Sequence, residues 1–425
     1  MPDVLQDLVG FLCRVRLGAA GLLWIRDRLF SLSLLPISRP PRCFTNRPWR
    51  RYSLGKHILI TGGAGFIGSH LADELLKHRY SVRVLDNLCT QVHGPGGKRP
   101  EYLNPDVELV TGDVRDPEAV RRSLKGIDAV YHFAASVGVG QSMYELARYT
   151  GINNLGTAVL LEELTRKPVE RLVVASSMSI YGEGLYRGRS GAVYETVERT
   201  PQQLRAGNWE LTGAAGEPLT PVATPESKSP CLASIYALGK YDQERMCLIV
   251  GGAYGIPTVA LRFFNVYGTR QALSNPYTGV LAIFASRYLN DRPPMIFEDG
   301  RQRRDFVSVR DVARVCRLAL TTPDAAGRVF NVGSGRAYTI LEIAERMGRV
   351  LGKERLRPTV TGKYRVGDIR HCFADISLAR RVLGYRPEVT LEAGLEELAG
   401  WLEGRIALDR VAEASAELAA RGLTV

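Results

Sequence analysis

From Lys56 onward, short apolar runs alternate with longer amphipathic segments. The runs are the lengths of strands, and several are apolar throughout, as expected for strands buried on both faces of a parallel sheet. They lie at residues 58–60, 82–85, 107–110, 129–135, 172–175 and 257–263. Between them, apolar residues recur every three or four positions, which predicts helices at 66–76, 117–124, 153–164 and 234–254. This alternation predicts an α/β fold with helices on both faces of the sheet.

A glycine-rich turn separates the first expected strand from the first helix. Gly62, Gly65 and Gly68 recur every three residues in TGGAGFIGSH. Such glycines let the backbone approach a pyrophosphate closely, and the helix that follows offers free N–H groups to the anion. Asp86 ends the second strand, 18 residues after Gly68, where a carboxylate would accept hydrogen bonds from an adenosine ribose. It would repel a 2′-phosphate, so the sequence predicts NAD and disfavours NADP.

Three side chains form the expected catalytic group. Tyr236 and Lys240 stand one turn apart on one face of the helix expected at 234–254. An ammonium at that spacing favours the phenolate and lowers the pKa of the tyrosine, as a general base requires. Ser177 follows the strand at 172–175, where the carboxyl edge of a parallel sheet meets its ligand. Its hydroxyl would hold a substrate oxygen near the phenol.

The chain divides into four parts. Residues 1–55 are expected to be a poorly ordered basic extension, and residues 56–264 to be mainly the nucleotide-binding domain. Residues 265–405 are expected to form a smaller substrate-binding domain, interleaved with the last strands of the sheet. The end of the chain, 406–425, is expected to be a helix and tail that serve packing or an oligomer surface.

A long insert interrupts the first domain at residues 183–230. It is rich in Gly, Pro, Thr and Glu, which predicts a functional or disordered loop. Its aromatic residues Tyr186 and Trp209 could stack on a base or sugar, although local packing is favoured.

Composition narrows the remaining function classes. Hydrophobic residues make up 45% of the 425-residue chain and charged residues 24%, as in soluble globular proteins. The net charge is +12, but residues 1–55 alone hold nine Arg and three Asp, so the remaining excess suits small anions better than nucleic acid. No apolar run approaches the length of a stable membrane span. Seven scattered cysteines without a C-x-x-C pair favour reduced thiols in the cytoplasm and disfavour a metal site.

The order of these motifs resembles that of the extended short-chain dehydrogenase/reductases, in the group of nucleotide-sugar epimerases and dehydratases. The similar stretches cover nearly the whole chain after residue 55: TGGAGFIGSH, LDNL, GDVRD, YHFAA, SSMSIYG, YALGK, RFFNVYG, DGRQRRDFV, FNVGSG and YRVGDIRH. The resemblance implies a Rossmann-like doubly wound parallel sheet with a smaller C-terminal substrate-binding α/β domain. It also implies bound NAD, a nucleotide-diphosphate sugar as substrate, and a homodimer formed by two helices of each subunit.

The resemblance further implies roles for individual residues. Those around the cofactor would be Gly62, Gly65, Phe66, Ile67, Gly68, Asp86, Asn87, Asp113, Val114, Ala134, Ala135, Tyr236 and Lys240. Within this set, Asp86 and Asn87 would hold the adenosine ribose, and Asp113 and Val114 would meet the adenine. The catalytic residues would be Tyr236, Lys240 and Ser177, and the substrate would also contact Asn265, Arg304 and Arg365. The two guanidinium groups would clamp its diphosphate.

The residues beside Ser177 narrow the range of reactions that the resemblance allows. Dehydratases of this group carry an Asp-Glu pair directly after the catalytic hydroxyl, decarboxylating relatives a Glu two positions after it, and 3,5-epimerases a Cys. Met178 and Ser179 stand there in this chain, so all three reactions are disfavoured. What remains is inversion of a sugar carbon, expected to be C4, through a transient keto sugar without net consumption of NAD.

The substrate expected from the resemblance is dTDP-L-rhamnose. Stretches such as AASVGVGQSM and TGKYRVGDIRHCFAD resemble a bacterial branch linked to dTDP-L-rhamnose 4-epimerase more than the common UDP-glucose 4-epimerases. The alternatives are a UDP-glucose/galactose 4-epimerase and an NAD-dependent nucleotide-sugar dehydrogenase or 4-ketoreductase.

Overall fold

The computed structural model describes residues 55–404 and 409–424, except 276, 278 and 366. The basic extension expected at 1–55 therefore lies almost entirely outside the described residues. No helix in the described part is long and apolar enough to cross a membrane.

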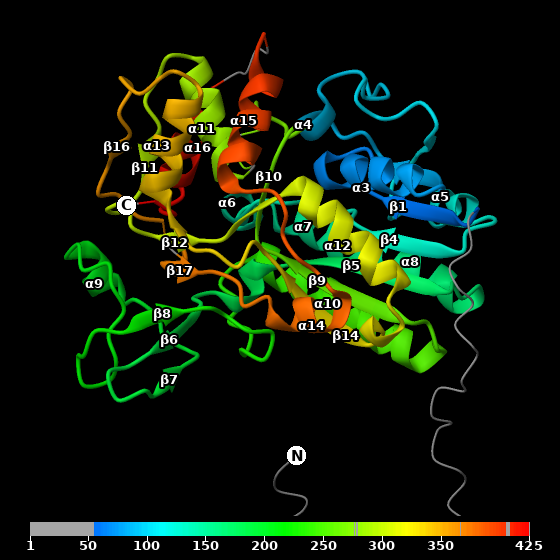
Figure 1. The fold of residues 1–425 in the computed structure, drawn as a ribbon, viewed down its shortest axis with the longest axis horizontal. Helices are drawn as coiled ribbons and strands as arrows, with labels where there is room; N and C mark the ends of the chain where they lie inside the picture. Colours follow the sequence, from blue (N-terminus) through cyan, green and yellow to red (C-terminus); the bar gives the residue numbers. More distant parts are fainter. Residues whose placement is uncertain (1–54, 276, 278, 366, 405–408, 425) are drawn as a thin grey trace, which may run out of the picture. The chain divides into compact units, whose positions relative to one another are not determined.

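A seven-stranded parallel sheet forms the centre of the molecule (Figure 1). Its strands are β1 (His57–Thr61), β2 (Ser81–Asp86), β3 (Glu108–Thr111), β4 (Ala129–His132), β5 (Arg171–Ser177), β9 (Thr258–Phe263) and β14 (Arg328–Val332). They are ordered β3-β2-β1-β4-β5-β9-β14, which is the doubly wound order that starts at β1 and grows in both directions. The predicted Rossmann-like sheet is confirmed, and its last strand comes from the C-terminal half of the chain.

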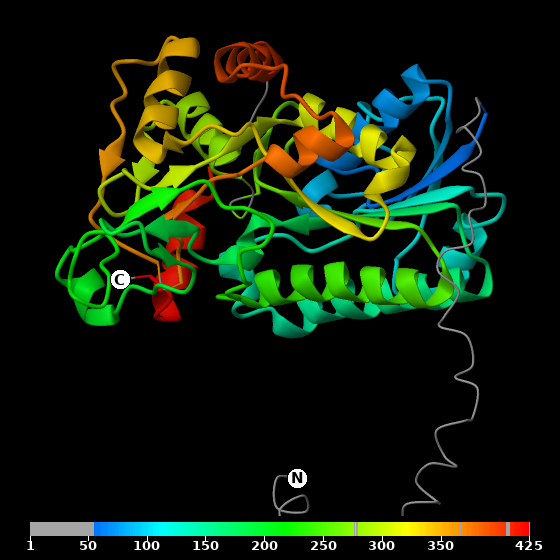
Figure 2. The same cartoon turned by 60° about the horizontal axis from the view of Figure 1, so that its bottom comes forward.

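Helices cover both faces of the sheet because alternate strand residues point to opposite sides. Ile58 and Ile60 belong to one core with helices α3 (Phe66–Lys77), α12 (Val309–Thr321) and α14 (Ser377–Leu383). Leu59 belongs to a second core with α5 (Pro117–Ser123), α8 (Gly156–Arg166) and α10 (Ile235–Tyr254). Figure 2 shows α10, in green, below the sheet and α12, in yellow, above it.

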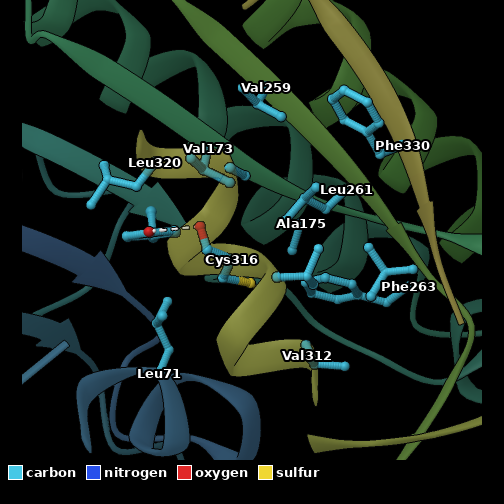
Figure 3. Packing of buried hydrophobic residues seen from close by; sticks show 14 of the residues in the cluster. Leu71, Val173, Ala175, Val259, Leu261, Phe263, Val312, Cys316, Leu320 and Phe330 are labelled. Carbon is cyan, nitrogen blue, oxygen red and sulfur yellow. Dashed lines mark hydrogen bonds between the residues drawn. The ribbon is translucent and has the colours of Figure 1, made fainter. Parts of the chain in front are cut away.

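The first of these cores is densely packed, and α12 is its centre. Val312, Cys316 and Leu320 recur at four-residue spacing on this helix and lie against strand residues such as Val173 and Leu261 (Figure 3). All five are fully buried.

The predicted helices and strands are found within a few residues of their expected bounds, with two informative differences. Strand β4 ends at His132, so Ala134 and Ala135 lie beyond the strand. The helix expected at 153–164 is α8, and a π-helical turn, η2 (Gly151–Leu155), precedes it. Such turns are common at functional sites.

The insert at 183–230 is ordered, which corrects the expectation of a long loop. It contains the antiparallel sheet β7-β6-β8, made of Val193–Tyr194, Leu185–Arg187 and Thr220–Val222, and helix α9 (Pro201–Arg205). Tyr186 is fully buried there with Leu211 and Leu219, so the favoured local packing of this residue is confirmed. These strands are too short to show a readable hydrophobic period.

The C-terminal half contributes a third core beside the sheet, visible at the upper left of Figure 1. It is built on α11 (Val280–Leu289), α13 (Ile340–Val350) and α15 (Leu391–Leu402). Small sheets flank it: β10 (Asn265–Tyr267) with β13 (Phe306–Ser308), β11 (Met295–Ile296) with β16 (Thr359–Val360), and β12 (Arg303–Arg304) with β15 (Tyr338–Thr339) and β17 (His371–Cys372). Helix α16 (Val411–Ala420) follows α15.

Candidate active site

A cavity of about 920 Å³ lies where the carboxyl ends of the central strands meet the C-terminal half. All the cofactor, catalytic and substrate residues that the resemblance implies line it: Gly62, Gly65, Phe66, Ile67, Gly68, Asp86, Asn87, Asp113, Val114, Ala134, Ala135, Ser177, Tyr236, Lys240, Asn265, Arg304 and Arg365. Residues up to about 300 positions apart in the chain therefore share one surface. In parallel sheets, ligands bind at this edge, where the strand order reverses direction.

The glycine turn after β1 is a close-packed cradle. Gly62 has φ +69°, and a Cβ on it would lie 2.8 Å from the backbone nitrogen of Ala134. A Cβ on Gly68 would lie 2.5 Å from the Cα of Gly63. Only glycine fits these two positions, and the turn leads directly into the N-terminus of α3. The backbone is thus free to approach an anion at that N-terminus.

Two carboxylates stand at the neighbouring strand ends. Asp86 is buried and accepts hydrogen bonds from the backbone nitrogens of Ala64 (3.0 Å) and Leu88 (2.9 Å), which hold it beside the glycine turn. Asp113 accepts from Asn87 Nδ2 at 3.1 Å and pairs with Arg115, whose hydrogen bonds lower the pKa of Asp113 to about 2. Asp113 is accordingly ionised, and a hydrogen-bond acceptor, at neutral pH.

These residues fit NAD. The glycine cradle suits a pyrophosphate, and the acceptors at Asp86 and Asp113 suit hydroxyl and amino donors of adenosine. His93 is a further candidate that the sequence analysis missed. Its Nε2 lies 3.6 Å from Asp86 Oδ1, and its buried Nδ1 has no hydrogen-bond partner within the described structure. Only the fold brings this histidine to the cavity, because it sits on a short helix with no motif of its own.

Ser177 and Tyr236 meet at the centre of the cavity. Ser177 ends β5, and its hydroxyl hydrogen-bonds the phenol of Tyr236. Ser179 donates its own hydroxyl to Ser177 Oγ at 2.9 Å, which leaves the Ser177 proton directed at the phenol. Ser234 caps α10 by accepting from Ala237, and the Tyr236 nitrogen donates to Ser142 Oγ at 3.1 Å, so the tyrosine is fixed at a rigid helix start.

The acidity of Tyr236 differs from the sequence prediction. Burial raises the pKa of Tyr236, and the hydrogen bond from Ser177 opposes this only in part. The ammonium of Lys240 donates instead to Gln243 Oε1 at 2.8 Å. The predicted lowering of the tyrosine pKa by Lys240 is therefore wrong for this arrangement. The four-residue spacing fixes only the distance between the Cβ atoms of Tyr236 and Lys240. The long lysine side chain is free to turn toward another acceptor, which here is Gln243.

Lys240 is held by a buried polar network. Burial lowers its pKa to about 8, although Cys247 and Glu244 act in the opposite direction. Gln243, whose oxygen accepts from Lys240, donates through Nε2 to Thr157 Oγ1 (2.9 Å) and to the carbonyl of Ala134 (3.2 Å). The network thus ties the lysine to α8 and to the backbone that lines the cavity.

The two predicted diphosphate arginines converge on one carboxylate. Arg365 Nη2 lies 3.1 Å and Arg304 Nη2 lies 3.6 Å from oxygens of Asp368. Burial raises the pKa of Asp368, but these guanidinium groups and Arg199 outweigh it and lower the pKa. Arg365 Nε and Asn265 Oδ1 are buried without a partner in the described part of the chain. Both atoms are available to a polar ligand.

Other predicted features lie elsewhere. Neither Tyr186 nor Trp209 of the insert lines this cavity, and Trp209 packs on Tyr364 with ring centroids 6.2 Å apart. By contrast, α16, which was expected to serve packing or an oligomer surface, contributes residues to the cavity wall. Within the described ranges no cluster of His, Cys, Asp and Glu is arranged to hold a metal ion.

Comparisons with known proteins agree with this geometry. The model of the NAD dependent epimerase/dehydratase family matches residues 58–333. The chain is 35% identical over 352 residues to a dTDP-L-rhamnose 4-epimerase of Burkholderia thailandensis, which covers 82% of this chain and 95% of that protein. It therefore belongs to the NAD-dependent epimerase/dehydratase family.

Solved structures show the same fold. The UDP-glucose 4-epimerase of Thermotoga maritima with UDP-glucose is 32% identical, with a TM-score of 0.66 over 81% of this chain and 98% of that one. The UDP-glucose 4-epimerase of Thermus thermophilus in complex with NAD is 31% identical, with a TM-score of 0.65 over 82% of this chain and 100% of that one. The predicted fold, the NAD cofactor and the class of NAD-dependent nucleotide-sugar epimerase are confirmed.

Proposed function

We propose that this enzyme inverts C4 of a nucleotide-diphosphate sugar through a transient 4-keto sugar, and that its substrate is dTDP-L-rhamnose. The observation that carries the reaction is the makeup of the catalytic centre. Tyr236, Ser177 and Lys240 all line the cavity, and the neighbours Met178 and Ser179 supply no carboxylate. Elimination of water or loss of carbon dioxide would need such an acid or base.

In this proposal Tyr236 transfers the proton, and Ser177 positions the substrate oxygen. Tyr236, as phenolate, takes the proton of the sugar C4 hydroxyl, and Ser177 donates a hydrogen bond that steadies the same oxygen. NAD supplies a reversible hydride acceptor when bound. After the keto sugar has turned, Tyr236 returns its proton to the same oxygen, which restores the hydroxyl with the opposite configuration at C4. Lys240, protonated, favours the phenolate whenever it turns from Gln243 toward the tyrosine.

Arg304, Arg365 and Asn265 are proposed to hold the diphosphate while the sugar turns. Two guanidinium groups offer planar donor pairs that match phosphate oxygens. A diphosphate would compete with Asp368 for them, and the unpartnered atoms of Arg365 and Asn265 support a ligand there. An anchor at the diphosphate alone leaves the sugar free to present either face.

The choice of sugar rests on the relatives. A 35% identical relative is a dTDP-L-rhamnose 4-epimerase, whereas the UDP-glucose 4-epimerases of Bos taurus and Thermotoga maritima are 30% and 32% identical. Proton NMR of the purified protein with dTDP-L-rhamnose, UDP-glucose and UDP-galactose, without added reductant, tests the choice. A new anomeric signal at a stable ratio with dTDP-L-rhamnose alone supports the proposal. Signals with the UDP sugars would favour the UDP-glucose 4-epimerase, and stoichiometric NADH would favour a dehydrogenase.

Replacing the proposed base separates catalysis from folding. Tyr236→Phe should lower turnover by about 10²–10⁴-fold, because the proposed acceptor of the hydroxyl proton is removed. Tyr254→Phe is the matched control, since Tyr254 lies on the same helix but is 55% exposed and lies outside the cavity. Turnover is followed by NMR and bound NAD by absorbance. Near-normal turnover of Tyr236→Phe would contradict the mechanism.

A cytoplasmic homodimer is the proposed setting. The five cysteines in the described residues are all free thiols, as in a reducing compartment. Exposed apolar side chains on α10 and η2 offer a surface for a second copy. Neither nucleic acid nor membrane is a proposed partner.

A further inference from the structure

Helix α16 forms part of the cavity wall. Val411, Ala414, Ser415 and Leu418 all line the cavity, and their spacing of three and four residues places them on one helical face. This face is apolar except for one hydroxyl. Ala414 and Leu418 are almost completely buried, although the helix lies close to the end of the chain.

Both ends of the helix are fastened to parts of the site. Before it, Asp409 accepts from Arg287 at 3.1 Å and Arg292 at 3.0 Å, which anchors the segment to the end of α11. After it, Thr424 forms an isolated antiparallel bridge with Arg365, one of the proposed diphosphate ligands.

The middle of the helix is held by a charged hydrogen-bond cluster. Glu417 Oε2 accepts from the hydroxyls of Tyr277 (2.8 Å) and Tyr144 (3.1 Å), and these two hydroxyls contact each other at 2.6 Å. The hydrogen bonds lower the pKa of Glu417, so it stays ionised and accepts strongly. Arg421 lies over the ring of Tyr144, 4.3 Å from its centroid.

The helix also reaches the segment that supports the catalytic tyrosine. A Cβ on Gly140 of α6 (Val139–Ser142) would lie 3.2 Å from Leu418 Cδ2, so the leucine rests directly on α6. Ser142, at the end of α6, accepts from the Tyr236 nitrogen. The chain from Leu418 to Thr424 thus spans from the neighbourhood of Tyr236 to Arg365. A sugar diphosphate between the proposed base and the proposed arginines must span the same interval.

We propose that α16 is part of the substrate site: the face carrying Ala414, Ser415 and Leu418 forms the wall against the sugar, and Glu417 positions that wall. This inference rests on the proposed function. An apolar wall favours a sugar with a methyl group at C6, because a C6 hydroxyl or carboxylate against it would lose water without gaining a partner. The sugar class selected by α16 is therefore a 6-deoxyhexose.

Binding and kinetic measurements on three variants test whether α16 forms this wall. Leu418→Ala should weaken binding of dTDP-L-rhamnose about tenfold but leave binding of dTDP unchanged, because dTDP has no sugar beyond the diphosphate. Glu417→Ala should raise KM at least as much, with a smaller fall in kcat, because the wall loses its position while the catalytic group stays intact. Glu413→Ala is the control, since Glu413 is exposed on the same helix and should behave as the unsubstituted enzyme.

A matched pair of ligands tests the proposed selectivity for a 6-deoxy sugar. dTDP-glucose and dTDP-6-deoxyglucose differ by one oxygen, and the unsubstituted enzyme should bind the 6-deoxy compound about tenfold more tightly. Leu418→Ser should remove most of that difference. Bound NAD and circular dichroism show whether each variant is folded.

The outcomes separate the two levels of the proposal. If the folded, NAD-loaded enzyme binds none of these sugar nucleotides, the proposed substrate class fails. If it binds them and Leu418→Ala changes neither affinity nor selectivity, α16 is not a substrate wall and this inference is overturned. If Leu418→Ala weakens dTDP and dTDP-L-rhamnose equally, α16 acts on the diphosphate end, which also overturns the assignment to the sugar.

Discussion

Gln243 has an amide group whose two ends are fixed by different partners. Its nitrogen faces two acceptors, Thr157 Oγ1 and the Ala134 carbonyl, so its oxygen is turned toward Lys240. His132 completes the network: burial, with the charge of Lys240, lowers its pKa to about 3, so the ring is neutral. A fixed acceptor beside a buried amine favours the protonated amine.

Gln243→Leu should shift the pH dependence of catalysis. In the proposed mechanism Lys240 acts in its charged form, so kcat/KM should fall as the pH rises through about 8, the pKa of Lys240. Removing the acceptor lowers this pKa further. A hydrogen bond to a charged group is worth about 1.5–3 kcal/mol, which moves the descending limb down by about one to two pH units. The pH profile of kcat/KM measures the shift.

Gln243→Glu is the informative counterpart. A carboxylate at the same position stabilises the ammonium and should move the descending limb to higher pH. A loss of activity that is equal at every pH in both variants would show that Gln243 serves only packing.

Glycines within the elements fall into two groups, those that the fold requires and those that it tolerates. Gly68 lies in the first turn of α3, where an added Cβ would meet the Gly63 backbone at 2.5 Å. Gly400 lies inside α15, exposed, with nothing within 4 Å of an added Cβ. The same substitution by alanine should therefore have opposite effects at the two positions.

Gly68→Ala should destabilise the protein by about 1–3 kcal/mol, because backbone must move to admit the methyl group. It should also weaken NAD binding about tenfold or more, because the cradle opens. Gly400→Ala should stabilise the protein by about 0.5–1 kcal/mol through helix propensity. Denaturant unfolding and NAD titration measure these changes. Normal NAD affinity in a folded Gly68→Ala protein would show that the close packing of the turn is not needed.

At the scale of the whole molecule, one exposed apolar surface stands apart from the active site. Leu238 and Ile249 on α10 are 41% and 60% exposed, and their spacing of eleven residues, three helical turns, puts them on one face. Leu155 of η2, beside α10, is 55% exposed. Such residues gathered on adjacent helices suit a subunit interface.

Ile249→Glu should convert the proposed dimer into a folded monomer, because a charge buried in an apolar interface loses its water without gaining a partner. Sedimentation velocity measures the mass, and bound NAD reports the fold. Val193→Glu is the control, since Val193 is 55% exposed on the insert, away from α10. A dimer that survives Ile249→Glu, or a monomeric unsubstituted protein, would rule this face out.

The long elements and the cavity-lining motifs were predictable because their signals are local. A buried parallel strand is apolar throughout, and the glycine turn, Tyr236–Lys240 and Ser177 each occur within or beside one such element. The insert was not predictable. Its structure depends on short strands and on buried ion pairs, such as that of Arg199 with Glu298 at 2.7 Å, which joins the insert to a segment about 100 residues further along the chain.

The sequence by itself determined the sheet and the cofactor class and indicated the proposed catalytic group, because these depend on residue types at short, fixed spacings. The tertiary structure alone decided where long side chains point and which distant segments meet. It turned Lys240 toward Gln243, brought His93 beside Asp86 and laid α16 along the cavity. These contacts depend on packing across many residues of separation, which no local pattern encodes.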